Sequence, residues 1–342
     1  MFAACWASSA VLAQGRAPTV APQGEARTVA GHVFTARASG RRPTPNVWVT
    51  LHRIGSDAAA PLDSMKTGAS GDYAFRFRPS GDTSAVYLVS GRFAGIAYFT
   101  SPLVRVRTVG GDADLVVFDT ASTGVMVTIE SRHVVISAPD PDGRRRIVEV
   151  FLLANTSDRT RVAAAAAPTF RATLPVNALD PRIAEGDVSA EAITFAGGEV
   201  RMTAPVAPGT KRVSFAYFVP ASRDPIAIAA TDSTAMLEVL VEDSAATVAG
   251  NVVREESPAS LVGRTFRRYI GQGVASTAML RITAPSGSRG SLGAIGMIVV
   301  AIGLGMTAVL AMTIRRGVPL GAPRPPPRLP PRPPLASPGG KA

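Results

Sequence analysis

The chain has 342 residues, which is enough for two or three domains of ordinary size, and 46% of them are hydrophobic, so each domain can bury a core. Residues 315–342 hold six of the 36 basic side chains and no acidic one, so the rest of the chain carries 30 basic against 25 acidic residues despite the net charge of +11. That mild excess argues against a nucleic-acid-binding protein. The single cysteine, Cys5, excludes an intrachain disulfide framework and a multi-cysteine metal site.

The first 14 residues, MFAACWASSAVLAQ, predict a signal peptide. They are apolar and end in Val11-Leu12-Ala13, which suits signal peptidase cleavage, but no basic residue precedes the apolar run. We therefore expect residues 1–14 to be a signal peptide whose start is truncated. The alternatives are a disordered N-terminus and, on the faint resemblance of Phe2–Cys5 to a lipoprotein box, a lipid anchor.

Short strands separated by turn clusters are predicted from Arg27 to about Phe118. The run Asn46–Ile54 is the clearest, because its residues alternate with a period of two. One face of this run holds Val47, Val49 and Leu51, and the other holds Trp48, Thr50 and His52. Roughly seven such strands with no amphipathic helix between them predict a β-sandwich over residues 27–120.

Several core and turn positions of this region form a recognisable set: Gly31-His32-Val33, Pro45 with Val47, Val49 and Leu51, and Thr67 with Gly71, Tyr73 and Phe75. In these positions the region resembles the carboxypeptidase regulatory-like family. The resemblance implies a transthyretin-type Greek-key sandwich that overlaps the carbohydrate-binding-like fold. If a glycan is bound, it needs exposed aromatic rings for stacking, and Trp48 and Tyr98 are the candidates for that role.

A zinc carboxypeptidase site is not present in the sequence. Such a site needs a closely spaced His and Glu and a distant second His, whereas none of the three histidines, His32, His52 and His133, has an acid three residues further on. Phosphate-binding, dinucleotide-binding and nucleophile-elbow motifs are also missing. We therefore expect no cofactor, no metal and no catalytic residue, although a site assembled in space would leave no such motif.

Strand patterns begin again at Gly124, and we expect a second β module over 124–190 and a membrane-proximal one over 191–285. Pro139–Gly143 is rich in turn residues and predicts a hairpin with the apolar strand that follows it. Arg144–Arg146 at the hairpin mouth form either a solvated loop edge or an anion site. Asn155-Thr156-Ser157 fits a glycosylation sequon, a pattern that also occurs by chance.

Arg264, Arg267 and Arg268 interleave with Phe266 and Tyr269 shortly before the most apolar stretch of the chain. The pattern indicates either contact with lipid headgroups or a partner, or an ordinary surface strand with alternating charged and aromatic residues. We favour the surface strand.

Ser291–Ile314 predicts a single transmembrane helix, because its 24 residues carry no charge. As a helix the segment is about 36 Å long, enough to span a hydrocarbon core of about 30 Å. Residues 315–342 are basic and rich in proline, so we expect a disordered or polyproline-II tail in the cytoplasm and the β modules outside. Small residues every four positions, such as Gly303 and Thr307, would allow two such helices to pair.

The sequence thus predicts an all-β protein with two or three tandem sandwich modules, one transmembrane helix and a disordered tail. The function we expect is that of a non-catalytic, single-pass type I membrane protein that binds or scaffolds an envelope partner. A tethered carbohydrate-binding module and a regulatory subunit of an envelope enzyme complex are the alternatives.

Overall fold

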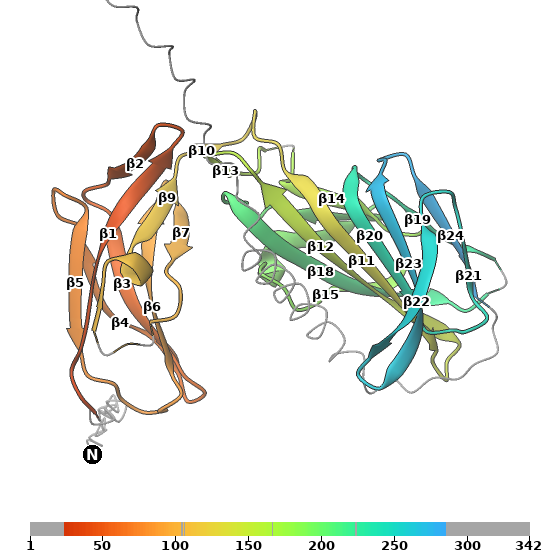
Figure 1. Ribbon diagram of the computed structural model, residues 1–342, viewed down its shortest axis with the longest axis horizontal. Coiled ribbons are helices and arrows are strands. Elements are labelled where there is room, and N and C mark those ends of the chain that lie inside the picture. Colours follow the sequence, from red (N-terminus) through yellow and green to blue (C-terminus); the bar gives the residue numbers. More distant parts are fainter. Residues whose placement is uncertain (1–23, 104, 106, 166, 223, 285–342) are drawn as a thin grey trace, which may run out of the picture. The chain divides into compact units, whose positions relative to one another are not determined.

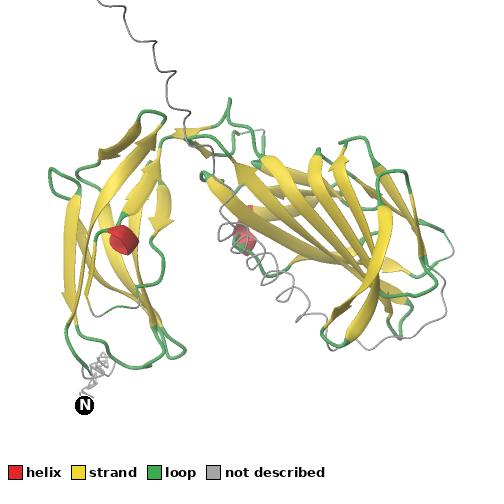
Figure 2. Cartoon of the chain, viewed as in Figure 1, coloured by secondary structure: helices red, strands yellow, loops and turns green. Residues whose placement is uncertain are grey.

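The computed structural model describes residues 24–103, 105, 107–165, 167–222 and 224–284. Within these ranges the regular elements are strands and two short 3-10 turns, η1 (Gly111–Ala113) and η2 (Ala190–Ala192), so the all-β prediction is confirmed there (Figures 1 and 2). The predicted signal peptide (1–14), transmembrane helix (291–314) and tail (315–342) lie outside the described residues. The described part of the chain holds no helix long and apolar enough to cross a membrane.

The N-terminal module is a sandwich of two sheets. Its strands are β1 (Arg27–Arg37), β2 (Gly40–Pro43), β3 (Trp48–Ile54), β4 (Ala59–Lys66), β5 (Asp72–Phe77), β6 (Val86–Phe93), β7 (Ile96–Phe99), β8 (Arg107–Val109) and β9 (Leu115–Phe118). One sheet runs β2-β1-β5, with β8 and β9 pairing parallel to β1, and the other runs β4-β3-β6-β7. The second sheet is antiparallel throughout.

The predicted alternation along β3 is confirmed. Val49 and Leu51 are fully buried in the module's core together with Tyr73, Phe75 and Val89. Gly31 on β1 lets the core close around η1, because a Cβ atom there would lie 2.3 Å from the carbonyl oxygen of Ala113. Along each strand the side chains between the buried ones point away from the core. The same period of two therefore determines which side chains form the outer face of each sheet.

The second module is built on a seven-stranded sheet in the order β15-β18-β12-β11-β20-β23-β22 (Figure 1). Its strands are β11 (Thr128–Pro139), β12 (Arg144–Asn155), β15 (Leu179–Ile183), β18 (Gly209–Pro220), β20 (Thr234–Val241), β22 (Arg254–Leu261) and β23 (Arg264–Val274). Two three-stranded sheets contribute to the same core. They are formed by β14 (Phe170–Thr173), β16 (Ile193–Ala196) and β17 (Glu199–Met202), and by β19 (Ile226–Ala229), β21 (Thr247–Ala249) and β24 (Met279–Thr283). Two residual strands, β10 (Thr120–Ala121) and β13 (Thr160–Arg161), pair with each other.

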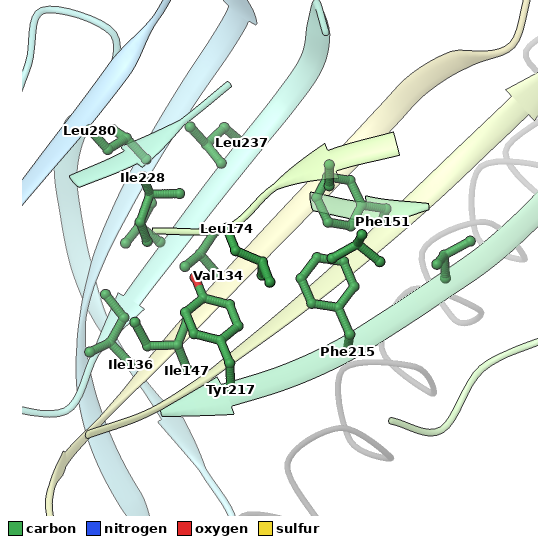
Figure 3. Close-up of a cluster of buried hydrophobic side chains, with 14 of the residues drawn as sticks. Val134, Ile136, Ile147, Phe151, Leu174, Phe215, Tyr217, Ile228, Leu237 and Leu280 are labelled. Carbon is green, nitrogen blue, oxygen red and sulfur yellow. The ribbon is translucent and has the colours of Figure 1, made fainter. Parts of the chain in front are cut away.

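The expected division into modules at 124–190 and 191–285 is wrong, because both ranges build one sheet and one core. Strand β12 from the first range pairs with β18 from the second, and β11 pairs parallel with β20. The core therefore joins Phe151 to Phe215 and Leu237 across more than 80 residues (Figure 3). Alternating strand patterns show that strands exist, but they do not show which strands pair.

Two ion pairs are buried on the core side of the large sheet. Arg132 donates to Glu149 at 2.8 Å from Nε and 2.6 Å from Nη2, and the hydroxyl of Tyr217 donates to the other carboxylate oxygen at 2.8 Å. Arg145 pairs with Asp243 at 3.0 Å. Each of these charges is nearly or fully buried, so each depends on its partner to offset the cost of leaving water.

Candidate binding face of the N-terminal module

The outer face of the sheet β4-β3-β6-β7 is the candidate site, and it is called the Trp48 face below. Strand register places its residues side by side. They are Trp48, Thr50, His52 and Ile54 on β3, Ser64 and Lys66 on β4, Val86, Leu88, Ser90 and Arg92 on β6, and Ala97 and Phe99 on β7. The exposed Leu62 lies at the bulge of β4 beside them.

Large apolar side chains are unusually exposed on this face. Trp48 is 55% exposed and Phe99 60% exposed, and Ile54, Leu62 and Val86 are each at least 40% exposed. These five belong to a single sheet, whereas scattered exposed hydrophobic residues are normal on any protein. Large exposed apolar side chains that gather on one sheet face are typical of an interaction surface.

The Trp48 end of the face is basic. Lys66 and Arg92 flank Trp48 on the two neighbouring strands, and the Lys66 ammonium lies 5.4 Å from the centre of the indole ring. This distance fits a cation–π contact, in which the ammonium lies over the face of the indole ring. The register rows of the Trp48 face contain no carboxylate, so the face presents positive charge only.

Hydroxyl groups and one imidazole form the middle of the face. Thr50 and Ser64 hydrogen-bond to each other at 2.9 Å, and His52 Nε2 lies 2.8 Å from the Ser90 hydroxyl. The His52 ring also lies 6.5 Å from the ring of Phe99. The row can donate and accept hydrogen bonds between the two aromatic side chains.

The loops at the Ile54 end are tied together by charged hydrogen bonds. Arg53 forms two 2.8 Å bonds to Asp57, and Asp82 accepts from the Ser56 and Ser84 hydroxyls. The serine hydrogen bonds hold the pKa of Asp82 well below its ordinary value, and the Arg53 guanidinium lowers the pKa of Asp57. Both carboxylates are therefore ionised at neutral pH and keep this end of the face in one shape.

Of the two residues that the sequence offered as stacking platforms, only Trp48 is exposed. Tyr98 is 7% exposed and belongs to the module's core. Its hydroxyl lies 2.8 Å from the Thr160 hydroxyl and 3.2 Å from the Phe118 carbonyl oxygen, which accounts for its polar atom. Phe99, one residue further on, points the other way and lies on the Trp48 face. The alternation along β7 places the two side chains on opposite faces, and the pairing of β7 with β6 decides which of them is buried.

The arginines of β23 are paired rather than free. Arg267 binds Glu255 at 2.8 Å, Arg268 binds Glu238 at 2.6 Å, and Arg264 pairs with Glu242. The interleaved Phe266 and Tyr269 are buried. Strand β23 is an inner strand of the large sheet, so its aromatic side chains belong to the interior and not, as the sequence pattern had indicated, to an exposed strand surface.

The other candidate features of the second module are also structural. Arg144 pairs with Asp140 and Asp142 across the predicted hairpin turn, and the neighbouring Arg145 is the buried partner of Asp243. Asn155 is 2% exposed and its amide donates to two backbone carbonyl oxygens, those of Arg159 and Val206. In the folded chain this asparagine is therefore closed to glycosylation. The described residues hold no cluster of three potential metal ligands.

Comparisons with known proteins identify no family. No protein-family model matches the chain, and none of the curated proteins matches it. Among solved structures, a chain of the major pilin subunit BcpA of Bacillus cereus is 12% identical and aligns over 76% of this chain and 86% of its own, with a TM-score of 0.19. The shaft pilin SpaA from Lactobacillus rhamnosus GG is 12% identical over 78% of this chain and 100% of its own, with a TM-score of 0.21. TM-scores this low carry no argument about the fold. The evidence for the β-sandwich is the pairing of its strands into two sheets around one core. The carboxypeptidase regulatory-like assignment stays a prediction.

Proposed function

We propose that this chain is a non-catalytic binding component of a bacterial cell envelope, held in the membrane by Ser291–Ile314 with its β modules outside. The Trp48 face is its binding surface. The observation that carries the proposal is the gathering of five exposed, large apolar side chains and two cations on one sheet face. A face of this kind loses unfavourable contact with water when a partner covers it.

The partner that suits the face best is a protein with an acidic rim. The aliphatic side chains Ile54, Leu62 and Val86 cannot stack on sugar rings in the way that an indole does, but they pack well against apolar side chains of a protein. Lys66 and Arg92 then face carboxylates of the partner, which makes association faster at low salt. Trp48 lies between these two charges and is the expected hot spot.

A glycan is the second candidate, favoured by the Trp48 end alone. An exposed indole ring with hydroxyl groups at Thr50, Ser64 and Ser90 offers one stacking surface and several hydrogen-bonding groups. A glycan array probed with the detergent-solubilised full chain separates the two candidates. Binding that Trp48→Ala abolishes and Ile54→Ser leaves intact favours the glycan.

Affinity capture from detergent-solubilised membranes tests the protein partner. A chain carrying Trp48→Ala and Phe99→Ala should lose the protein that the parent chain recovers, and Trp48→Ala alone should weaken binding about 30-fold, as expected of a hot spot worth about 2 kcal/mol. Val109→Ala is the matched control, because Val109 is an equally exposed apolar residue on β8 of the opposite sheet. Equal recovery of the partner by the double variant, by Trp48→Ala and by Val109→Ala refutes the proposal, and so does the absence of any reproducible partner.

If the recovered protein is an enzyme whose rate changes when this chain is added, the regulatory-subunit alternative is favoured.

Protease accessibility tests the topology. In spheroplasts of cells with a tag at each end of the chain, the β modules should be cleaved from outside and the tail beyond Arg316 protected. Cleavage of the tail together with protection of the β modules would show that the β modules face the cytoplasm. That result would refute the proposed function in the envelope.

A further inference from the structure

Strand β5 of the N-terminal module is the edge strand of its sheet. It pairs with β1 along one side, and no described strand pairs with its other side (Figure 1). The Gly71 carbonyl oxygen accepts the Val33 N–H of β1 at 2.8 Å, whereas the next carbonyl, that of Asp72, accepts from Gly68 in the preceding loop. Because these directions alternate along an antiparallel strand, the N–H and C=O groups of Ala74 and Arg76 point away from β1, along the free edge.

The other long edge strands in the described part of the chain are protected against pairing. Strands β4, β15 and β22 each contain a proline, which removes a backbone donor. These prolines are Pro61, Pro181 and Pro258, and a shift of register lies beside each of them. Strand β5 contains no proline, and its register with β1 is unbroken from end to end. Prolines and bulges prevent edge-to-edge association, so β5 is the long edge that is left able to pair.

The side chains of β5 are complementary to a second copy of the same strand. Asp72, Ala74 and Arg76 are exposed, whereas Tyr73 and Phe75 are buried in the core. Two copies that pair antiparallel about a two-fold axis at Ala74 place Asp72 of each copy opposite Arg76 of the other. Opposite charges directly across two antiparallel strands are stabilising, and the pairing satisfies the free backbone groups of both edges.

The neighbouring strand β1 extends this complementarity. His32 and Ala30 of β1 lie beside Asp72 and Ala74 in the sheet. Across two paired copies the central row therefore contains alanines only, which leaves the rows on either side of it to the charged groups. In each of those rows the Asp72 carboxylate lies between His32 of its own copy and Arg76 of the other. The same register thus aligns small side chains at the axis and opposite charges beside it.

We propose that two copies of this chain associate through β5, antiparallel about Ala74, so that the sheets β2-β1-β5 of both copies form one continuous sheet. The partner at the free edge is thus a second copy of this chain. The inference goes beyond the proposed function, because the Trp48 face belongs to the other sheet, β4-β3-β6-β7, and takes no part in the pairing. A dimer presents two Trp48 faces, and it binds a partner with two sites more tightly than a single chain does.

Disulfide crosslinking of the full chain tests the inference. In a Cys5→Ser background, which removes the only native cysteine, Ala74→Cys places one cysteine of each copy at the two-fold axis. Opposed residues of a hydrogen-bonded antiparallel pair have Cα atoms about 5.5 Å apart, within the range of about 4.4–6.8 Å that a disulfide spans. Ala60→Cys is the matched control, because Ala60 is an exposed alanine on β4, the edge strand that contains Pro61.

Both chains are solubilised in detergent with micelles in excess over protein, oxidised, and separated by electrophoresis without a reducing agent. The covalent dimer of the Ala74→Cys chain should exceed that of the Ala60→Cys chain about tenfold, because pairing through β5 raises the effective concentration of one cysteine near the other. Equal yields from the two positions show that the copies meet elsewhere or at random. Equal yields, or the absence of a covalent dimer, overturn the inference.

Charge exchange separates specific pairing from misfolding. Added to Ala74→Cys, Asp72→Arg places arginine opposite arginine, and Arg76→Asp places aspartate opposite aspartate, so each variant alone should yield about five times less covalent dimer. A mixture of the two variants, carrying different tags, restores the opposite charges in the mixed dimer, whose yield should return to that of the chain with Ala74→Cys alone. Unchanged yields of the single variants overturn the inference, and so does a mixed dimer no more abundant than theirs.

Hydrogen exchange provides a measurement without cysteine substitutions. The Ala74 amide should exchange about ten times more slowly in the parent chain than in Arg76→Asp, because only the dimer supplies this amide with a hydrogen-bond acceptor. Mixing Arg76→Asp with Asp72→Arg should slow the exchange again. Equal exchange in the parent and in Arg76→Asp shows that the edge is uncovered, or that it is covered by something other than a second copy, and overturns the inference.

Discussion

Removing the charge of Glu149 tests the buried ion pair at the centre of the second module. In Glu149→Leu the Arg132 guanidinium keeps its 2.8 Å bond to the Ala229 carbonyl oxygen but loses both bonds to the carboxylate. The Tyr217 hydroxyl loses its acceptor at the same time. Burial, followed by the nearby Glu149 carboxylate, raises the pKa of Tyr217 well above its ordinary value, so the hydroxyl is protonated and needs an acceptor.

The expected loss is large. Breaking a buried pair by removing one partner costs about 3–5 kcal/mol, because the remaining charge is left in a medium of low polarity. The unpaired tyrosine hydroxyl adds about 1–3 kcal/mol. The sum is comparable with the entire free energy of unfolding of a domain, about 5–15 kcal/mol. The second module of the variant should therefore be largely unfolded at ambient temperature, or unfold at a much lower urea concentration than in the parent chain.

Urea unfolding of the full chain, followed by far-UV circular dichroism and tyrosine fluorescence, measures the effect. The control is Glu199→Gln, which removes one partner of the exposed Arg201–Glu199 pair and should change the free energy of unfolding by at most about 1 kcal/mol. The double variant Arg132→Met with Glu149→Leu should recover most of the loss, because no buried charge is left alone. A single-variant loss as small as that of the control would show that the pair is not desolvated and would refute the reasoning.

Three further predictions concern the N-terminal module. Gly31→Ala should lower its melting temperature markedly, because the added Cβ would overlap the Ala113 carbonyl oxygen, and a melting temperature within a degree of the parent would contradict the close approach. Tyr98→Phe should cost about 0.5–1.5 kcal/mol in urea unfolding through loss of its hydrogen bonds to Thr160 and Phe118. Asp82, whose folded pKa is depressed, should stabilise its loops at every pH above its unfolded value of about 3.9 and lose that contribution as the pH falls further. A carboxyl carbon NMR titration that places the Asp82 midpoint near 3.9 or higher would be the contrary result.

The Trp48 face shows how much of a binding surface can be predicted from the alternation of residues within single strands. The alternation of Asn46–Ile54 separates Val49 and Leu51 from Trp48, and the structure keeps that separation. The same rule applied to β7 distinguishes the buried Tyr98 from the exposed Phe99, but it does not say by itself which of the two sets faces the core. That choice depends on the pairing of β7 with β6, which places Phe99 opposite Ser90 and in one plane with Trp48.

The sequence by itself determined the all-β class, the strands with one apolar face, and the candidate turns, because each depends on neighbours a few residues apart. Only the tertiary structure decided that β12 pairs with β18 and β11 with β20, so that two expected modules are one. It also decided that Glu149, in an apolar run, meets Arg132, and that Val148 and Val150 are buried apart from the core. Strand pairing and burial join residues that are far apart in the chain, and a period of two specifies the face of a strand without specifying what covers it.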